Sequence, residues 1–213
     1  MPSVYQLKSA FSDLLRPLTN QLANKGVTAN QVTVTAMLGS VLLAGSLYFS
    51  TANSLITPLL WLSVPLWMFI RMALNNIDGM LAREHNMSTP QGAILNEMGD
   101  VVSDSALFLA FAALPGINIP LLVMLTLLAV MSEMIGVVAV QIGASRRYDG
   151  PSGKSDRALF FGVLGLLYAL GINPGTWSTL VLLLITVLLV ATIVNRAKSA
   201  LREVNGNTAA EAD

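Results

Sequence analysis

The chain has 213 residues and no net charge, and 54% of its residues are apolar while only 11% are charged. Soluble proteins carry about 25% charged residues, so a soluble fold would need a large core with almost no charged surface. The composition argues against a soluble domain, gives no sign of a nucleic-acid partner, and predicts a single all-α domain in a membrane. Cysteine is absent, which excludes disulfides and thiolate metal sites.

Residues 1–26 combine apolar positions at helical spacing with charged residues between them. The apolar positions are Val4, Leu7, Phe11, Leu14, Leu15, Leu18 and Leu22. This pattern predicts an amphipathic helix lying on the cytoplasmic membrane surface. A helix packed against the rest of the protein would show the same periodicity.

Six apolar segments follow, each bounded by charged or turn-forming residues. A helix that crosses the hydrocarbon core needs about 20 residues. The segments cover roughly residues 32–50, 55–83, 92–114, 119–143, 157–171 and 175–195. The fifth is short, so we expect it to begin within the preceding polar loop or to tilt less than the others. Residues 27–196 are thus predicted to form a six-helix transmembrane domain, and residues 197–213 a polar cytoplasmic tail.

The basic residues are concentrated on one side of this predicted arrangement. The loops near residues 84–91 and 144–157 contain many of them, whereas Thr51–Ser54, Pro115–Asn118 and Gly171–Pro174 carry no charge. Because basic loops remain in the cytoplasm, both termini and the two basic loops are predicted to be cytoplasmic. The protein is expected in a bacterial inner membrane.

Two acids, Asp78 and Asp100, lie on the ends of the second and third segments. Charge in a membrane is costly and often marks a reaction site. A helix turns about 100° per residue. Asp78 therefore shares one face of the second segment with other polar or small residues, and Asp100 lies on a similar stripe of the third segment. These two faces consist of Arg71, Asn75, Asp78 and Ala82, and of Gly92, Asn96, Asp100 and Asp104. The short intervening loop makes the two helices antiparallel neighbours.

The oxygen atoms of these two faces are predicted to converge near the cytoplasmic surface. Clustered carboxylate and amide oxygens suit hard divalent cations, so we expect Mg²⁺ or Mn²⁺. The predicted metal ligands are Asp78, Asp100, Asn75 and Asn96, with Asp104 as a further candidate.

The spacing Asp78-Gly79-xx-Ala82-Arg83-x8-Gly92-xxx-Asn96-xxx-Asp100 resembles the signature of the CDP-alcohol phosphatidyltransferases. That signature contains four acids, of which Asn75 and Asn96 replace two in this chain. Residues 27–31 (VTANQ) also resemble the start of the family's first span.

The resemblance implies that a phosphatidyl group is transferred from a CDP-linked lipid, CDP-diacylglycerol, to a small polar alcohol or its phosphate, with release of CMP. Asp78 would bind metal and the donor headgroup, Asp100 would be the general base, and Gly79, Ala82 and Gly92 would line the cytidine pocket. A homodimer is also implied. Because Asn75 and Asn96 bring no charge, we expect one metal ion or weaker metal binding.

A second basic segment, residues 145–157, contains Arg146, Arg147, Lys154 and Arg157. Arginine binds phosphate through two parallel hydrogen bonds and lysine acts as a point charge. These residues therefore either bind a phosphorylated acceptor or the donor diphosphate, or they only fix the topology on anionic lipid. Arg157, next to a span, is the best single candidate for an acceptor phosphate, and Arg83 can also meet a phosphate.

Charges inside the segments leave further alternatives. Glu133 is expected in a buried ion pair that fixes helix packing, whereas Arg71 could belong either to such a pair or to the wall of an acceptor pocket. For the whole protein, the alternative to an enzyme is a catalytically impaired relative that acts as a membrane binding or scaffold protein. A transporter is disfavoured because the loops on the opposite side carry no ionisable residues.

Overall fold

The computed structural model describes residues 4–50 and 56–210, which form seven α-helices and one short 3-10 turn without any strand. The helices are α1 (Val4–Asn24), α2 (Ala29–Tyr48), α3 (Ile56–Glu84), α4 (Pro90–Ala110), α5 (Ile119–Gln141), α6 (Lys154–Ala169) and α7 (Thr176–Ala210), and the turn η1 (Phe111–Ala113) follows α4. The predicted all-α class is therefore confirmed. The predicted loop Thr51–Ser54 lies outside the described residues.

Local sequence signals set the starts of several helices. Thr28 caps α2 in a reciprocal arrangement with Gln31, and Thr89 caps α4 just before Pro90. Each cap satisfies backbone N–H groups that have no partner within the helix. The short fifth segment begins at Lys154, inside the preceding polar loop, as its length suggested.

Four of the helices are long and apolar enough to cross a membrane. They are α2, α3 from Thr57 onward, α5, and α7 as far as Gly206. The other two predicted spans, α4 and α6, are not among these four helices. Helix α6 has only 16 residues, and α4 carries Glu97, Asp100 and Asp104. The membrane character is confirmed by the four apolar helices.

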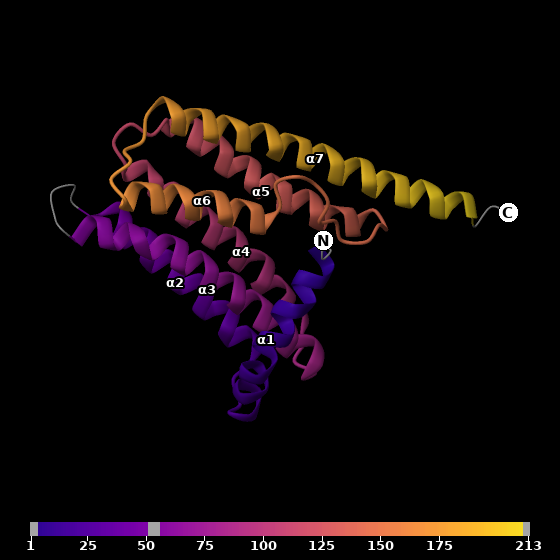
Figure 1. Cartoon of the computed structure of the whole chain (residues 1–213). Helices are drawn as coiled ribbons and strands as arrows, with labels where there is room; N and C mark the ends of the chain where they lie inside the picture. The colour runs from indigo at the N-terminus through magenta and orange to yellow at the C-terminus, as the bar shows by residue number, and fades with distance from the viewer. Residues whose placement is uncertain (1–3, 51–55, 211–213) are drawn as a thin grey trace.

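The helices pack mainly in neighbouring pairs, with α2 against α3 and α4, α3 against α6, and α5 against α7 (Figure 1). The α3–α4 loop, the α5–α6 loop and α1 gather at one end of the bundle, beyond which the C-terminal part of α7 extends. Close packing of α6 on α3 depends on Gly165, where a Cβ atom would lie 2.9 Å from Val64. The fold thus places the two basic loops at the same end.

The opposite end of the bundle holds the apolar core. The rings of Phe108 and Phe161 stack with centroids 3.9 Å apart, and Phe111 meets Trp61 edge to face at 4.9 Å. All four side chains are buried. This core fixes α3, α4 and α6 relative to one another, so that polar residues farther along the same helices meet at the other end.

Helix α1 packs against α3. Phe11 meets Phe69 edge to face at 6.0 Å, the Ser12 hydroxyl donates to the side-chain oxygen of Asn76 over 3.2 Å, and Arg16 pairs with a glutamate at the end of α3. The apolar stripe predicted for residues 1–26 therefore faces the bundle over part of its length.

Candidate active site

A cavity of about 300 Å³ lies at the end of the bundle that carries the two basic loops. Helices α2, α3 and α4 and the α3–α4 loop form its walls. Most of the predicted substrate-binding residues line it: Asn75, Asp78, Gly79, Ala82, Arg83, Gly92 and Asn96. The structure thus brings parts of the two predicted helix faces to one space, which we call the motif cavity. The expectation that α3 and α4 are close packing neighbours is not borne out, because α2 packs against each of them and they meet through polar side chains such as Asn75 and Asp100.

Gly92 lets α4 approach the start of α2. A Cβ atom at this position would lie 2.7 Å from Asn30 Oδ1 and 3.0 Å from Thr89 Oγ1. The Gly92 N–H also donates to Thr89 Oγ1 over 3.0 Å, which completes the cap of α4. The glycine predicted from spacing alone therefore lets α4 lie close to Asn30 of α2, while the cap uses a backbone N–H that any residue except proline would supply.

Asp78 is 5% exposed and is oriented by α2, because the Thr33 hydroxyl donates to Asp78 Oδ2 over 2.8 Å. On the next turn, the guanidinium of Arg83 lies over Gly79, 3.1 Å from where a Cβ atom would be. In the part of the chain that the structure describes, Arg83 forms no ion pair with a carboxylate. This cation remains available to an anionic ligand in the cavity.

Asp100 is held by three side chains that meet the same oxygen atom. Asn75 Nδ2 donates to Asp100 Oδ1 over 3.1 Å, Arg71 Nη2 lies 3.4 Å from that atom, and Lys154 pairs with it as well. These three side chains line a second cavity of about 510 Å³, which also includes Arg83. Asp100 contacts this wall and its side chain is 19% exposed, although neither lining includes it.

A third, largely apolar groove of about 400 Å³ continues from the second cavity between α3 and α6. The two share Met68, Met72, Ser155 and Ala158. Since Asn75 and Arg83 also line both the motif cavity and the second cavity, the three spaces adjoin one another. A polar site thus passes into an apolar surface of the bundle.

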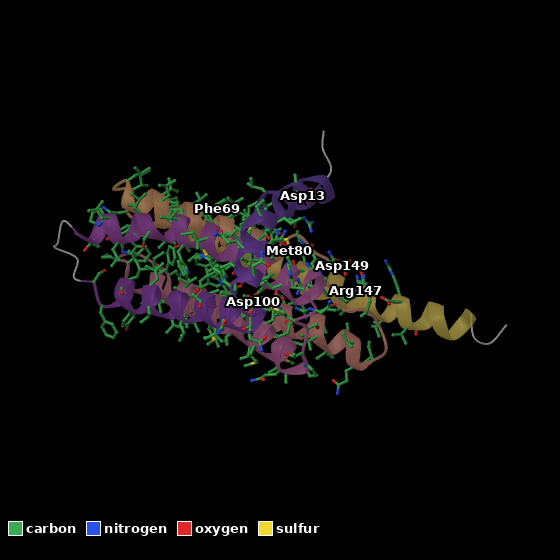
Figure 2. The ribbon with its side chains drawn as sticks, turned by 90° about the horizontal axis from the view of Figure 1, so that it is seen from below. Asp13, Phe69, Met80, Asp100, Arg147 and Asp149 are labelled. Carbon is green, nitrogen blue, oxygen red and sulfur yellow. The ribbon has the colours of Figure 1, made fainter. Side chains whose placement is uncertain are left out.

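Of the four basic residues predicted in segment 145–157, only Lys154 lines one of these cavities. Arg146 pairs with Glu97 over 2.7 Å. Arg147 donates to Asp149 over 2.8 Å, which holds the pKa of that carboxyl below its usual range. Figure 2 shows Arg147 and Asp149 side by side at the same end of the bundle as Asp100.

Arg157, the leading sequence-based candidate for an acceptor phosphate, is 0% exposed. Its Nη2 lies 3.1 Å from Asp104 Oδ2 and 2.9 Å from Glu133 Oε1. The reason is its position on the first turn of α6, which turns the side chain into the bundle. Arg157 is therefore not placed to receive a phosphate from the cavities.

Asp104, a further metal candidate in the sequence, also belongs to this buried network. It pairs with Arg71 on one side and with Arg157 on the other. The expected ion pair of Glu133 is present, and Arg71 both joins the network and lines the second cavity. With two arginines on its carboxylate, Asp104 is already satisfied without a metal ion.

Sequence reasoning missed three contributors to these sites: Asn30, Thr33 and Arg196. Asn30 and Thr33 lie on the first turns of α2 and line the motif cavity. Residues 27–31 already suggested a polar start to this helix, which was a usable signal for Asn30. Arg196 is 1% exposed inside α7 and pairs with Glu133 over 3.5 Å. In the sequence it directly follows an apolar segment, where a basic residue is expected to fix membrane topology and no further role is indicated.

The sequence was compared with known families and proteins. A sequence model of the CDP-alcohol phosphatidyltransferases matches residues 26–194. The chain is 45% identical over 199 residues to the inner membrane protein YnbA of Escherichia coli, which covers 93% of this chain and 96% of that protein. It is 28% identical over 190 residues to a phosphatidylinositol phosphate synthase of Mycobacteroides abscessus, covering 84% of this chain and 83% of the relative.

Solved structures show the same fold. The phosphatidylinositol phosphate synthase PgsA1 of Mycobacterium tuberculosis in complex with manganese and citrate matches with a TM-score of 0.66 and 23% identity, over 87% of this chain and 88% of that one. The same enzyme with CDP-DAG bound gives a TM-score of 0.62 at 23% identity, over 88% and 92% of the two chains. Sequence signature, motif cavity and fold agree, and the chain belongs to the CDP-alcohol phosphatidyltransferase family.

Proposed function

We propose that this protein transfers a phosphatidyl group from CDP-diacylglycerol to a small polar alcohol and releases CMP. The observation that carries the proposal is the motif cavity, in which residues separated along α3 and α4 meet at the spacing of the family signature. PgsA1, which has the same fold, has been solved with CDP-DAG bound. Membership of the family supports the same class of donor here.

The three adjoining cavities suit the parts of such a donor. The apolar groove between α3 and α6 would hold acyl chains, and the motif cavity would hold the nucleotide. Arg83 lines the two polar cavities and is free of carboxylate partners among the described residues. A guanidinium in that position can bind the diphosphate through charge-assisted hydrogen bonds.

The oxygen donors around the motif cavity fit a hard divalent cation. Asp78 would supply one carboxylate, and Asn75 and Asn96 would supply amide oxygens. The negative charge of Asp100 is close enough to Asp78 to act on it electrostatically. Among the described residues no group of three or more acids, histidines or cysteines is placed to hold a metal, so the proposed site relies on the amide oxygens of Asn75 and Asn96 beside Asp78. A bound Mg²⁺ or Mn²⁺ would neutralise the diphosphate and stabilise the leaving CMP.

Asp100 is the proposed proton acceptor. The alcohol oxygen attacks the β-phosphorus, the bond from that phosphorus to the bridging oxygen breaks, and CMP leaves while the hydroxyl proton passes to the carboxylate. Arg71, Asn75 and Lys154 all contact Oδ1. Within the described residues Oδ2 has none of these contacts, so it is the oxygen that we assign to the proton.

The membrane arrangement that we propose has all six helices α2–α7 crossing the bilayer, with α1 on the cytoplasmic surface. Helices α4 and α6 fit because their charges pair inside the bundle, as between Asp104 and Arg157. The basic loops at the motif-cavity end support a cytoplasmic active site and cytoplasmic termini. Similarity to an inner membrane protein of Escherichia coli supports the bacterial inner membrane, and family membership supports a homodimer.

Product analysis with labelled CDP-diacylglycerol and a panel of alcohols tests the function. We expect CMP release that requires both Mg²⁺ or Mn²⁺ and an alcohol. Full activity in excess chelator would contradict the metal role. Donor binding without CMP release for any alcohol would instead identify the alternative, a catalytically impaired relative that acts as a membrane binding or scaffold protein.

The asparagines of the signature allow a direct test of metal affinity. Asn96→Asp adds a carboxylate to the wall of the motif cavity, so we expect metal binding to tighten by at least about tenfold, the scale of one added charged ligand contact. Titration calorimetry with Mn²⁺ measures this change, and Asn173→Asp, at the opposite end of the bundle, is the matched control. Unchanged or weaker binding in Asn96→Asp would remove this account of the asparagines.

A further inference from the structure

Glu133 of α5 is a buried carboxylate that meets three arginines from three other segments. Its Oε1 lies 2.9 Å from Arg157 on α6 and 3.5 Å from Arg196 on α7, and its Oε2 lies 3.5 Å from Arg146 in the α5–α6 loop. Arg157 and Arg196 are 0% and 1% exposed. We call Arg146, Arg157 and Arg196 the arginine cluster, and Glu133 is the counter-ion that its members share.

Two further carboxylates of α4 complete the neutralisation of the arginine cluster. Glu97 lies 2.7 Å from Arg146, and Asp104 lies 3.1 Å from Arg157. Backbone carbonyl groups accept further hydrogen bonds from the cluster. For example, Arg196 Nε donates to the Asp149 carbonyl over 3.1 Å. Arg146 Nη1 and Arg157 Nε are buried without a hydrogen-bond partner among the described residues, but the charge of each cluster arginine is matched by at least one carboxylate.

The arginine cluster lies next to the proposed reaction site. Arg71 connects Asp104 to Asp100, the proposed base, and Glu97 directly follows Asn96, which lines the motif cavity. A phosphorylated acceptor approaching the anionic donor needs nearby cations to offset its charge. The arginine cluster is the group of cations at this end of the described bundle that would be suited to that task, and each member is already paired.

A phosphate could enter the arginine cluster only by displacing Glu133. The displaced carboxylate would remain buried without a partner, which is strongly unfavourable. If Glu133 stayed in place, two anions would share one desolvated site. Lys154 is likewise paired with Asp100. Arg83, the cavity-lining cation without a carboxylate partner in the described chain, is needed for the donor diphosphate.

We infer that the acceptor is an uncharged polyhydroxy alcohol rather than its phosphate ester, and that Glu133 determines this specificity by occupying the arginine cluster. The inference rests on the proposed function and narrows its acceptor. Hydroxyl groups of such an alcohol can bond to polar side chains of the second cavity, including Asn75 and Asn76, without any added cation.

Binding of inorganic phosphate tests the inference without turnover. Titration calorimetry on the purified protein at low ionic strength should show no saturable phosphate binding to the native chain other than a site at Arg83, which Arg83→Ala would remove. Glu133→Gln removes the shared counter-ion with little change of shape and should bind phosphate at least about tenfold more tightly. Glu133→Asp retains the charge and should behave as the native chain.

A matched control is Glu203→Gln, which removes a carboxylate from the exposed partner of Arg147, outside the arginine cluster. We expect it to leave phosphate binding and CMP release unchanged. Saturable phosphate binding to the native chain that persists in Arg83→Ala, as tight as to Glu133→Gln, would overturn the inference. If Glu133→Gln does not fold, the titration of the native chain still decides.

An acceptor comparison gives the second readout, with uncharged polyols and their phosphate esters, such as glycerol and glycerol 3-phosphate, assayed in pairs. We expect the polyols to support CMP release, and the esters neither to replace nor to inhibit them. Preference for an ester in any pair would overturn the inference. If no acceptor supports CMP release, the proposed function fails, and the phosphate titration still reports on the arginine cluster.

Discussion

Asp78→Asn and Asp100→Asn are both expected to lower CMP release strongly, and for Asp100→Asn the loss should be about 100- to 10,000-fold, the range that a positioned proton-transfer group contributes. Asp100 loses its proton-accepting oxygen, and Asp78 loses the charge that would bind the metal in the motif cavity. Both substitutions keep the shape of the side chain, so the Thr33 and Asn75 contacts can be replaced by related hydrogen bonds. CMP release with saturating donor and polyol measures the loss.

The matched control for these two variants is Asp13→Asn, because Asp13 is an exposed acid on α1 at the same end of the bundle (Figure 2). We expect it to retain full activity. The two variants are expected to differ from each other, since only Asp78→Asn should also weaken Mn²⁺ binding strongly. Activity of Asp100→Asn within about tenfold of the native chain would show that another group accepts the proton.

Arg157→Ala is expected to destabilise the fold by about 3–5 kcal/mol, because it leaves Asp104 and Glu133 as buried charges that have lost a partner. The midpoint of thermal unfolding in detergent measures the effect. This outcome differs from the effect on acceptor KM that the sequence alone suggested for this residue, and the reason is its complete burial.

The control is Arg147→Ala, which removes ion pairs with Asp149 and Glu203 at a more accessible position. Such pairs contribute about 0–1 kcal/mol, so its thermal midpoint should change little. A midpoint for Arg157→Ala equal to that of Arg147→Ala would show that the buried network is not what holds α4, α5 and α6 together. A raised acceptor KM in a fully stable Arg157→Ala variant would restore the sequence-based role.

Much of the fold was predictable because apolar segments and basic loops follow simple physical rules. Each of the six predicted segments overlaps one observed α-helix, and the early start of α6 at Lys154 was expected because its apolar segment is short. The motif cavity was predictable for a similar reason. Helical periodicity and a short loop predicted that Asp78 and Gly92 would line one space, whereas the expected direct packing of α3 on α4 is not found among the described helices, because α2 packs against both.

The partners of the charged residues were not predictable, because they depend on contacts between segments far apart in the chain. Glu133 meets Arg196, 63 positions away, and nothing in local spacing indicates that encounter. Thr33 orients Asp78 from another helix in the same way. Periodicity shows the face on which a residue lies, whereas the choice between a ligand and an ion-pair partner depends on how helices pack in three dimensions.

The charges of α4 and α6 have a consequence for membrane insertion. Of helices α2–α7, these are the two that fall short of an autonomous membrane span, and they carry opposite charges that meet in the Asp104–Arg157 pair. Segments with unpaired charge enter the bilayer poorly. Helix α4 leaves the ribosome before α6, so in the six-span arrangement proposed above Asp104 at first has only Arg71 of α3 as a partner. The Asp104–Arg157 pair would then form late, and a chain ending after α5 would lack it.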